Sequence, residues 1–281
     1  MSIVLKNVSY TYSGGTPLAR QSLRNVDISV SDGEWVVVMG PTGSGKSTLL
    51  QHLNGLLKPS LGQVLIDGTD IHSSVSRLKA ARQKIGFVFQ YPEHQLFGST
   101  VFEEVSYGPV NFGYSESEVE GMVQNALSIV GLSFTDYKDR SPHELSGGEK
   151  RRAALAGVLA TSPKVIALDE PTAGLDYNGK RRLVETVARL NQERGTTVIW
   201  VTHEISEIAT LANRLIVLNQ GKVVLDGNAR EGLYNPLLDE LGLDIPLAVR
   251  VAKSLKKRGK VIEGHLVTVD EIKGEILRLA R

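Results

Sequence analysis

The spacing of hydrophobic residues divides this chain into strand-like and helix-like regions. Near the start, apolar and β-branched residues alternate with polar ones, which is the period-two pattern of half-buried strands. Short, mostly apolar runs follow, and such runs are typical of strands that are buried on both faces. We predict alternating strands at 3–12 and 24–30, and further strands at Trp35–Met39, 63–66, Ile85–Phe89, Lys164–Leu168 and Thr197–Val201.

Between residues 91 and 145 the strand pattern gives way to helical periodicity. Ser115 and Glu118 have the spacing of a capping box, in which each side chain bonds the other residue's backbone N–H. After this box, apolar residues recur every three or four positions until Gly131, a typical helix stop. These apolar residues are Val119, Val123, Ala126, Leu127 and Val130. We predict a helical insert over 91–145, within a helical subdomain of about 91–160.

Strands and helices then alternate towards residue 228, and this order predicts a mostly parallel sheet in an α/β domain. The predicted helices outside the insert follow the glycine-rich turn near residue 40 and the two later buried strands. They lie at Leu49–Leu57, 178–193 and 204–213, and a closing hairpin is predicted at Arg214–Leu218 and Val223–Leu225.

The pattern changes again after residue 228, where Pro236 and Pro246 interrupt regular structure. A helix is predicted over 246–259, and Thr268 and Glu271 form a second capping box before further apolar residues at helical spacing. We therefore expect two parts, a large domain at 1–228 and a small α-rich C-terminal appendage at 229–281.

Composition narrows the class of protein without identifying it. The net charge is +1, so no chain-wide basic field favours nucleic acid as a partner. The absence of cysteine excludes disulfides, thiolate metal sites and cysteine nucleophiles. No apolar run approaches the ~18 residues of a membrane span, and the N-terminus lacks the pattern of a signal peptide. Any role at a membrane must therefore depend on a partner or a surface contact.

The strongest chemical signal is the segment GPTGSGKST, which lies between a predicted strand and a predicted helix. Glycines let the backbone curl so that its N–H groups point inward, and the helix start adds a positive dipole end. Such a loop holds phosphates, with Lys46 reaching the terminal phosphates and the Ser47 hydroxyl placed as a Mg²⁺ ligand. The residues expected to bind nucleotide here are Gly40, Pro41, Thr42, Gly43, Ser44, Gly45, Lys46, Ser47 and Thr48.

A second signal is the run VIALDE, in which two carboxylates follow a buried strand. Ligands of doubly wound folds gather at the carboxyl ends of strands, so these carboxylates should face the phosphate loop. Asp169 is placed to hold Mg²⁺, and Glu170 to polarise the attacking water. Without the phosphate loop, the same run would be an ordinary polar strand end.

A third signal is LSGGE followed by an apolar helical pattern. Ser146 is a good N-cap, and the two glycines expose the backbone N–H groups at the helix start. This makes a second anion-binding helix terminus in one chain, although the motif alone indicates only that a helix begins.

In this order, GPTGSGKST, Gln90, LSGGE, VIALDE, AGLD and His203 make residues 1 to about 228 similar to the ATPase subunit of ABC transporters. The resemblance implies an ATPase with a phosphate-loop core, an N-terminal antiparallel β subdomain and a helical insert. It implies that Tyr12 stacks on adenine and that Gln90 reaches Mg²⁺ and the water. Ser146, Gly147 and Gly148 would contact nucleotide held by another subunit. Asp176 would lie at the dimer interface, and His203 would contact the γ-phosphate.

The chain has one phosphate loop and one signature helix start, so two subunits are needed to enclose a nucleotide from both sides. ATP would then join the subunits, and its hydrolysis would release them. In this interpretation Lys46, Glu170, His203 and Gln90 act in hydrolysis, with ATP and Mg²⁺ as ligands.

A narrower resemblance rests on YPEHQLF after Gln90 and on the appendage, which are similar to ATPases of energy-coupling factor importers. It implies a second ATPase subunit, identical or not, a transmembrane coupling protein and a substrate-binding membrane subunit. The chain would be peripheral, at the cytoplasmic side of the cell membrane, with no nucleic-acid partner. The docking segment is expected to comprise Tyr91, Pro92, Glu93, His94, Gln95, Leu96 and Phe97. The alternative is a soluble ABC ATPase that acts on DNA or ribosomes.

Overall fold

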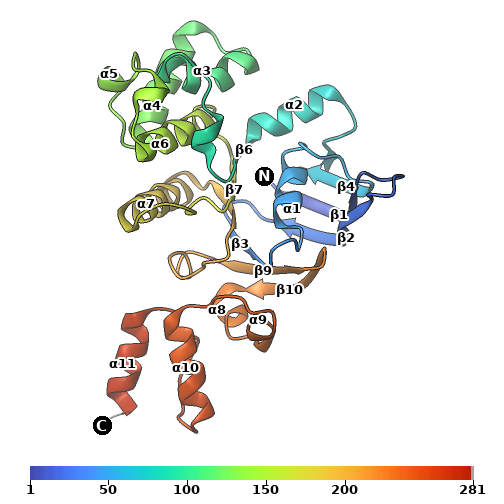
Figure 1. The fold of residues 1–281 in the computed structure, drawn as a ribbon, viewed down its shortest axis with the longest axis vertical. Coiled ribbons are helices and arrows are strands. Elements are labelled where there is room, and N and C mark those ends of the chain that lie inside the picture. The colour runs from blue at the N-terminus through green and yellow to red at the C-terminus, as the bar shows by residue number, and fades with distance from the viewer. Residues whose placement is uncertain (280–281) are drawn as a thin grey trace.

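The computed structural model describes residues 1–279 and contains two β-sheets with helices around them (Figure 1). The smaller sheet is antiparallel and has the strand order β2-β1-β4-β5. Its strands are β1 (Ile3–Tyr12), β2 (Arg20–Val30), β4 (Leu61–Ile66) and β5 (Thr69–Asp70). Asp67 and Gly68 both have positive φ, as a tight two-residue hairpin turn between β4 and β5 requires.

The larger sheet has six strands in the order β10-β9-β3-β8-β7-β6, and all neighbours are parallel except β10 with β9. Its strands are β3 (Trp35–Met39), β6 (Ile85–Val88), β7 (Val165–Asp169), β8 (Thr197–Val201), β9 (Arg214–Asn219) and β10 (Lys222–Asn228). This parallel arrangement brings the carboxyl ends of β9, β3, β8, β7 and β6 to one edge, where chemistry is expected.

The central strand β3 is buried on both faces, which explains its uninterrupted apolar sequence. Trp35, Val37 and Met39 belong to the core on one side, and Trp35 stacks on Trp200 of β8 with 5.9 Å between ring centroids. Val36 and Val38 belong to the core between the two sheets. Two cores therefore fix the strand from which the phosphate loop leaves.

A group of helices lies beyond the sheets, at the top of Figure 1. It contains η1 (Pro92–Gln95), α3 (Val101–Phe112), α4 (Glu116–Ile129), α5 (Phe134–Tyr137), η2 (Pro142–Glu144) and α6 (Gly147–Leu159). The predicted capping box of Ser115 and Glu118 starts α4, and Gly131 follows with positive φ. Buried residues of α3, α4 and α6 join the core of the larger sheet.

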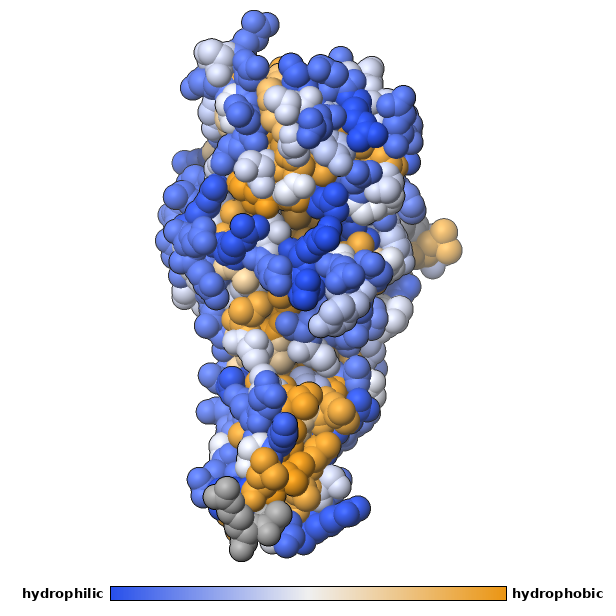
Figure 2. All heavy atoms as spheres, turned by 90° about the vertical axis from the view of Figure 1, so that its left-hand side faces the viewer, coloured by the Kyte–Doolittle hydropathy of each residue, from blue (hydrophilic) through white to orange (hydrophobic). Residues whose placement is uncertain are grey.

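The remaining helices flank the sheets and form the C-terminal end. These are α1 (Lys46–Leu53), α2 (Val75–Lys84), α7 (Tyr177–Arg194), α8 (Ala229–Gly232), α9 (Pro236–Glu240), α10 (Leu247–Lys257) and α11 (Val269–Leu279). Figure 2 shows apolar side chains gathered on the surface over the C-terminal helices, whose exposed apolar residues include Leu247, Ile276 and Leu277. None of the helices in residues 1–279 is both long and apolar enough to cross a bilayer.

The predicted α/β class with a mostly parallel sheet is confirmed, but one predicted helix is absent and one helix was not predicted. The helix expected at 204–213 is a series of turns, because its start is held by a local side-chain bond and its end by a bond to β3. Thr202 Oγ1 accepts from the Glu204 N–H, and the Asn213 N–H donates to the carbonyl of Trp35. Helix α2 was missed because Ala81 is its one buried residue, so it lacks an apolar stripe.

Candidate active site

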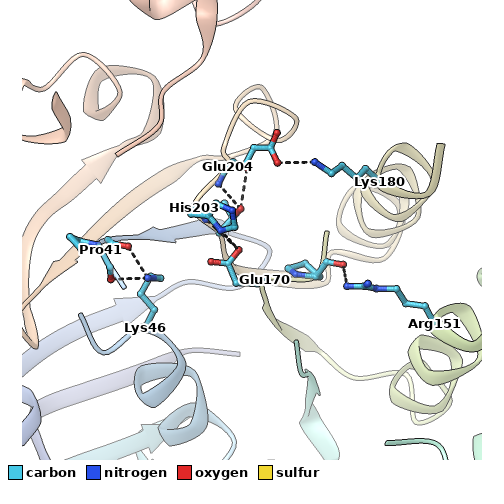
Figure 3. A network of polar contacts seen from close by, with 10 residues as sticks. Pro41, Lys46, Arg151, Glu170, Lys180, His203 and Glu204 are labelled. Atoms are coloured by element: carbon cyan, nitrogen blue, oxygen red, sulfur yellow. Dashed lines mark hydrogen bonds and ion pairs between the residues drawn. The ribbon is translucent and has the colours of Figure 1, made fainter. Parts of the chain in front are cut away.

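Four strands of the larger sheet deliver the predicted catalytic segments to the same edge. The phosphate loop follows β3, Gln90 follows β6, Glu170 follows β7 and His203 follows β8. Because β3, β8, β7 and β6 are consecutive parallel neighbours, these segments leave the sheet side by side. Gln90 itself is exposed at this edge, and His203 and Glu170 are shown in Figure 3.

The glycines of the phosphate loop are required by close backbone approach. Gly40 and Gly45 both have positive φ, and a Cβ on Gly45 would lie 2.7 Å from the carbonyl oxygen of Ser22. A Cβ on Gly40 would overlap the carbonyl of Leu218. No other residue fits at these two positions without moving the sheet, so the sequence fixes a curled loop before α1.

A pocket of about 240 Å³ lies against this loop. It is lined by Tyr12, Arg20, Ser22, Gly43, Gly45, Lys46, Ser47 and Thr48. The Tyr12 hydroxyl lies 3.1 Å from Thr48 Oγ1, and Tyr12 is 38% exposed, so its ring is available for stacking. Thr48 is buried and also contacts the Ser22 hydroxyl at 2.8 Å, which ties α1 to β2.

Lys46 is folded back onto its own loop (Figure 3). Its Nζ donates to the carbonyl of Gly40 at 2.7 Å and to that of Pro41 at 3.1 Å. Burial lowers the pKa of Lys46, and the carboxylates of Glu170 and Asp169 oppose this shift. The ammonium group is therefore partly desolvated, and an anion would interact with it more strongly than in water. Ser44 Oγ is buried close by without a hydrogen-bond partner.

Asp169 is the last residue of the buried strand β7. Its Oδ1 is buried and has no hydrogen-bond partner. Burial raises the pKa of Asp169, while the Ser47 hydroxyl acts against this shift. A buried carboxylate oxygen near a hydroxyl is a donor set suited to Mg²⁺, so Asp169 and Ser47 fit the predicted metal role.

Glu170 is held in place by His203. Its Oε2 lies 2.8 Å from His203 Nδ1, and the His203 backbone N–H also donates to it at 3.4 Å (Figure 3). The backbone of Glu170 has φ of +46°, a strained conformation for a residue with a side chain. The strain and the two bonds fix the direction of one carboxylate at the sheet edge.

The signature segment, residues 146–148, is exposed at the start of α6. Ser146 caps α6, and its side chain forms a capping box with Glu149. Ser146, Gly147 and Gly148 are all exposed, and a Cβ on Gly147 would meet nothing within 4 Å. Among the described residues, those lining the pocket at the phosphate loop include none from this segment.

Asp176 is the N-cap of α7 and accepts from the Gly179 N–H at 2.8 Å. It is exposed. Together with Gly147 and Gly148, it lines a larger cavity of about 550 Å³ between α6 and α7. The signature segment and the aspartate therefore share one face of the chain.

The segment after Gln90 has some side chains that pack against the protein and others that are exposed to solvent. Pro92 is buried, and Glu93 faces Arg151 of α6, with 3.7 Å between Glu93 Oε1 and Arg151 Nη1. Tyr91 and Phe97 are exposed, and Phe97 packs edge to face with the exposed Tyr107 of α3. Leu96 is half-buried, and His94 and Gln95 are exposed.

Sequence reasoning missed three polar residues that connect these parts. Arg151 donates to the carbonyls of Ala173 and Pro171, so α6 is bonded to the loop before Asp176. Lys180 of α7 pairs with Glu204 at 2.7 Å, beside His203 (Figure 3). Tyr137 of α5 donates to Glu149 at 2.6 Å. No sequence spacing signals such contacts, because their partners are 12 or more residues away.

Comparison with known proteins gives the same class as the geometry. The family described as "ABC transporter" matches residues 23–173. The chain is 46% identical, over all of its length and 98% of the relative's, to the energy-coupling factor transporter ATP-binding protein EcfA2 of Caldanaerobacter subterraneus subsp. tengcongensis. It is 47% identical to the protein of that name from Symbiobacterium thermophilum, over 96% of this chain and 94% of the relative.

Two solved structures resemble this one over most of its length. One is cbiO1 from Clostridium perfringens, described as part of the ABC transporter complex cbiONQ, with a TM-score of 0.74 and 36% identity over 89% of this chain and 98% of that chain. The other is the ATP-binding cassette MJ0796, described as dimeric and bound to ADP and Pi, with a TM-score of 0.72 and 34% identity over 81% of this chain and 98% of that chain.

A phosphate loop, a strand-end carboxylate pair and an exposed signature helix define an ATP-binding and ATP-hydrolysing cassette. The chain belongs to the ABC transporter family. Within this family it groups with the ATP-binding subunits of energy-coupling factor transporters, which it matches from end to end.

Proposed function

We propose that this chain is the motor of an energy-coupling factor importer for vitamins or other micronutrients. It pairs with a second ABC ATPase subunit and acts on a transmembrane coupling protein, which carries a substrate-binding membrane subunit. The chain would lie peripherally at the cytoplasmic side of the cell membrane. The relatives compared above are named as subunits of transporters. No finding favours the alternative of a soluble ATPase acting on DNA or ribosomes.

The proposal assigns these tasks to different parts of the chain. Residues 1–228 form the ATPase domain, in which residues of about 91–160 are the mobile helical subdomain. Residues 229–281 form an appendage outside the catalytic unit. This division is supported by the segregation of helices between η1 and α6, and by the described residues after Asn228, whose regular elements are all helices.

One observation carries the proposed mechanism: the phosphate-loop pocket and the signature segment are both open, yet they do not meet within one chain. Ser146, Gly147 and Gly148 would therefore bind nucleotide held by the phosphate loop of the other subunit. The nucleotide gains hydrogen-bond donors from both subunits, so binding favours the closed dimer. Asp176, on the same face, would contact the partner.

Within one chain, Tyr12 would stack on the adenine, and the loop from Gly40 to Thr48 would surround the phosphates. Lys46 would exchange its two carbonyl bonds for bonds to the terminal phosphates. Ser47, Asp169 and Gln90 would hold Mg²⁺, which supplies charge neutralisation at the phosphates when bound. The unpartnered Oδ1 of Asp169 supports this assignment.

Hydrolysis would depend on Glu170 and His203. The Glu170 carboxylate accepts a proton from the attacking water, while His203 orients that carboxylate and contacts the γ-phosphate. Lys46 stabilises charge that develops on the phosphate oxygens. Gln90, which follows β6 and precedes the docking segment, would contact the water and the metal.

Movement would reach the membrane partner through the segment from Tyr91 to Phe97. The exposed rings of Tyr91, Phe97 and Tyr107 offer an apolar contact surface. Glu93 faces Arg151, and Arg151 bonds the loop that leads to Asp176. A shift at the dimer interface can therefore pass through one arginine to the docking segment.

Substitution of Ser146 by alanine tests the two-subunit site. In the complex extracted with its native partners, ATP hydrolysis should fall by roughly 10²–10³-fold, the scale for loss of one preorganised donor. In the isolated chain, nucleotide affinity should not change, because the intact phosphate loop binds nucleotide alone. A loss of affinity in the isolated chain would place Ser146 in its own subunit's site and refute the proposal.

A further inference from the structure

The Ser146 hydroxyl has one proton, and in this structure it already donates that proton to a hydrogen bond. Ser146 Oγ donates to Glu149 Oε2 at 2.7 Å, and the Ser146 backbone N–H donates to the same oxygen at 2.8 Å. The Glu149 backbone N–H completes the box by donating to Ser146 Oγ at 3.4 Å. To donate to a phosphate, the hydroxyl must first leave the carboxylate.

The other oxygen of Glu149 is held from a neighbouring helix. The Tyr137 hydroxyl, at the end of α5, donates to Glu149 Oε1 at 2.6 Å, and the Arg140 guanidinium lies over the Tyr137 ring at 5.1 Å. The hydrogen bond from Tyr137 and then those from Ser146 lower the pKa of Glu149 to about 2. Glu149 is therefore anionic throughout the physiological pH range.

We propose that the Glu149 carboxylate competes with the γ-phosphate for the Ser146 hydroxyl, and so shortens the lifetime of the nucleotide-bound dimer. This inference rests on the proposed function, in which Ser146 meets nucleotide held by the other subunit. The Ser146 hydroxyl would then lie between the Glu149 carboxylate and the γ-phosphate, which are both negatively charged. Tyr137 limits the competition, because its hydroxyl satisfies one oxygen of the carboxylate.

Two variants of this network should act in opposite directions. Glu149→Gln keeps an acceptor for the capping box but removes the charge, so the nucleotide should be held longer. Tyr137→Phe leaves Oε1 without its donor, so the carboxylate should hold the Ser146 hydroxyl more strongly and the nucleotide should leave sooner. A role confined to capping α6 would not produce opposite signs.

The chain supplies a matched control in the same group of helices. Ser115 donates to Glu118 through its hydroxyl at 2.6 Å and through its backbone N–H at 2.8 Å, at the start of α4. Hydrogen bonds from Ser115 lower the pKa of Glu118. Glu118→Gln thus makes the same chemical change in an equivalent capping box outside the signature segment.

The test uses the complex extracted with a tagged full-length chain, loaded with a radiolabelled non-hydrolysable ATP analogue. Release is followed after dilution into excess unlabelled analogue. Glu149→Gln should slow release by about tenfold, the size expected from removing one like charge near a protein surface. Tyr137→Phe should speed release, and Glu118→Gln should leave it unchanged.

Ser146→Ala, measured in the same way, distinguishes a failure of the proposed competition from a failure of the two-subunit site. If Ser146→Ala speeds release, but Glu149→Gln either does not change release or also speeds it, the competition is refuted while the two-subunit site stands. If Ser146→Ala has no effect on release, the two-subunit site itself is wrong. Equal effects of Glu149→Gln and Glu118→Gln would assign both carboxylates to helix capping alone.

Discussion

His203 Nδ1 lies 2.8 Å from Glu170 Oε2, so a residue after β8 fixes the carboxylate after β7. The side chain of Glu170 is 14% exposed, whereas that of His203 is 71% exposed. The histidine thus reaches from the solvent side to a carboxylate that is otherwise enclosed by the sheet edge. A small displacement of the His203 loop would turn the proposed base towards or away from the attacking water.

Glu170→Gln should slow ATP hydrolysis by roughly 10²–10⁴-fold, the usual scale for loss of a general base. Binding should persist, because the phosphate loop is unchanged, and the variant should accumulate an ATP-bound dimer. Steady-state hydrolysis by the assembled complex measures the first effect, and size-exclusion chromatography of the isolated chain with ATP measures the second. Wild-type turnover in this variant would remove Glu170 from the mechanism.

Lys180→Ala should lower the turnover number and leave the KM for ATP unchanged. Lys180 pairs with Glu204, the neighbour of His203, and a partly exposed ion pair is worth about 1 kcal/mol or less, so the loss should be about fivefold or smaller. Lys180→Arg should restore most of the rate. Arg181→Ala, which breaks the exposed pair with Glu185 on the same helix, is the control and should have no effect.

Asp169→Asn should raise the thermal stability of the nucleotide-free chain while it abolishes Mg²⁺-dependent hydrolysis. Burial raises the pKa of Asp169, so the folded chain retains a proton that the unfolded chain releases. The stability of the wild type therefore falls as pH rises from the ordinary carboxyl pKa through the raised one. Thermal unfolding near pH 4 and pH 7 should show a gain in stability for the variant that is larger at pH 7.

Phe97→Ala should weaken coupling to the membrane partner without unfolding the chain. The Phe97 ring is 62% exposed and packs on the exposed Tyr107, so its removal leaves no cavity in the core. Uptake by the reconstituted transporter should fall relative to ATP hydrolysis by the isolated chain. Val75→Ala, at an exposed apolar residue of α2, is the matched control. Unimpaired uptake by the Phe97 variant would exclude this ring from docking.

Local chemistry made several parts of the site predictable. The phosphate loop could be identified because Gly40 and Gly45 occupy positions where any Cβ would strike a carbonyl oxygen. The capping boxes at Ser115 and Thr268 could be identified because their partners lie three residues away. The segment at 204–213 was wrongly assigned because its buried apolar residues have helical spacing, although its last residue, Asn213, bonds to Trp35 of β3.

The amino-acid order alone determined the α/β class, the curled phosphate loop and the carboxylates at the end of β7, because each depends on residues close together in the chain. Tertiary structure alone decided that His203 holds Glu170, that Arg151 bonds the loop before Asp176, and that Tyr137 holds Glu149. These contacts join segments from different strands and helices. Their partners are set by how the sheet order and helix packing bring distant segments together, and no local spacing encodes that arrangement.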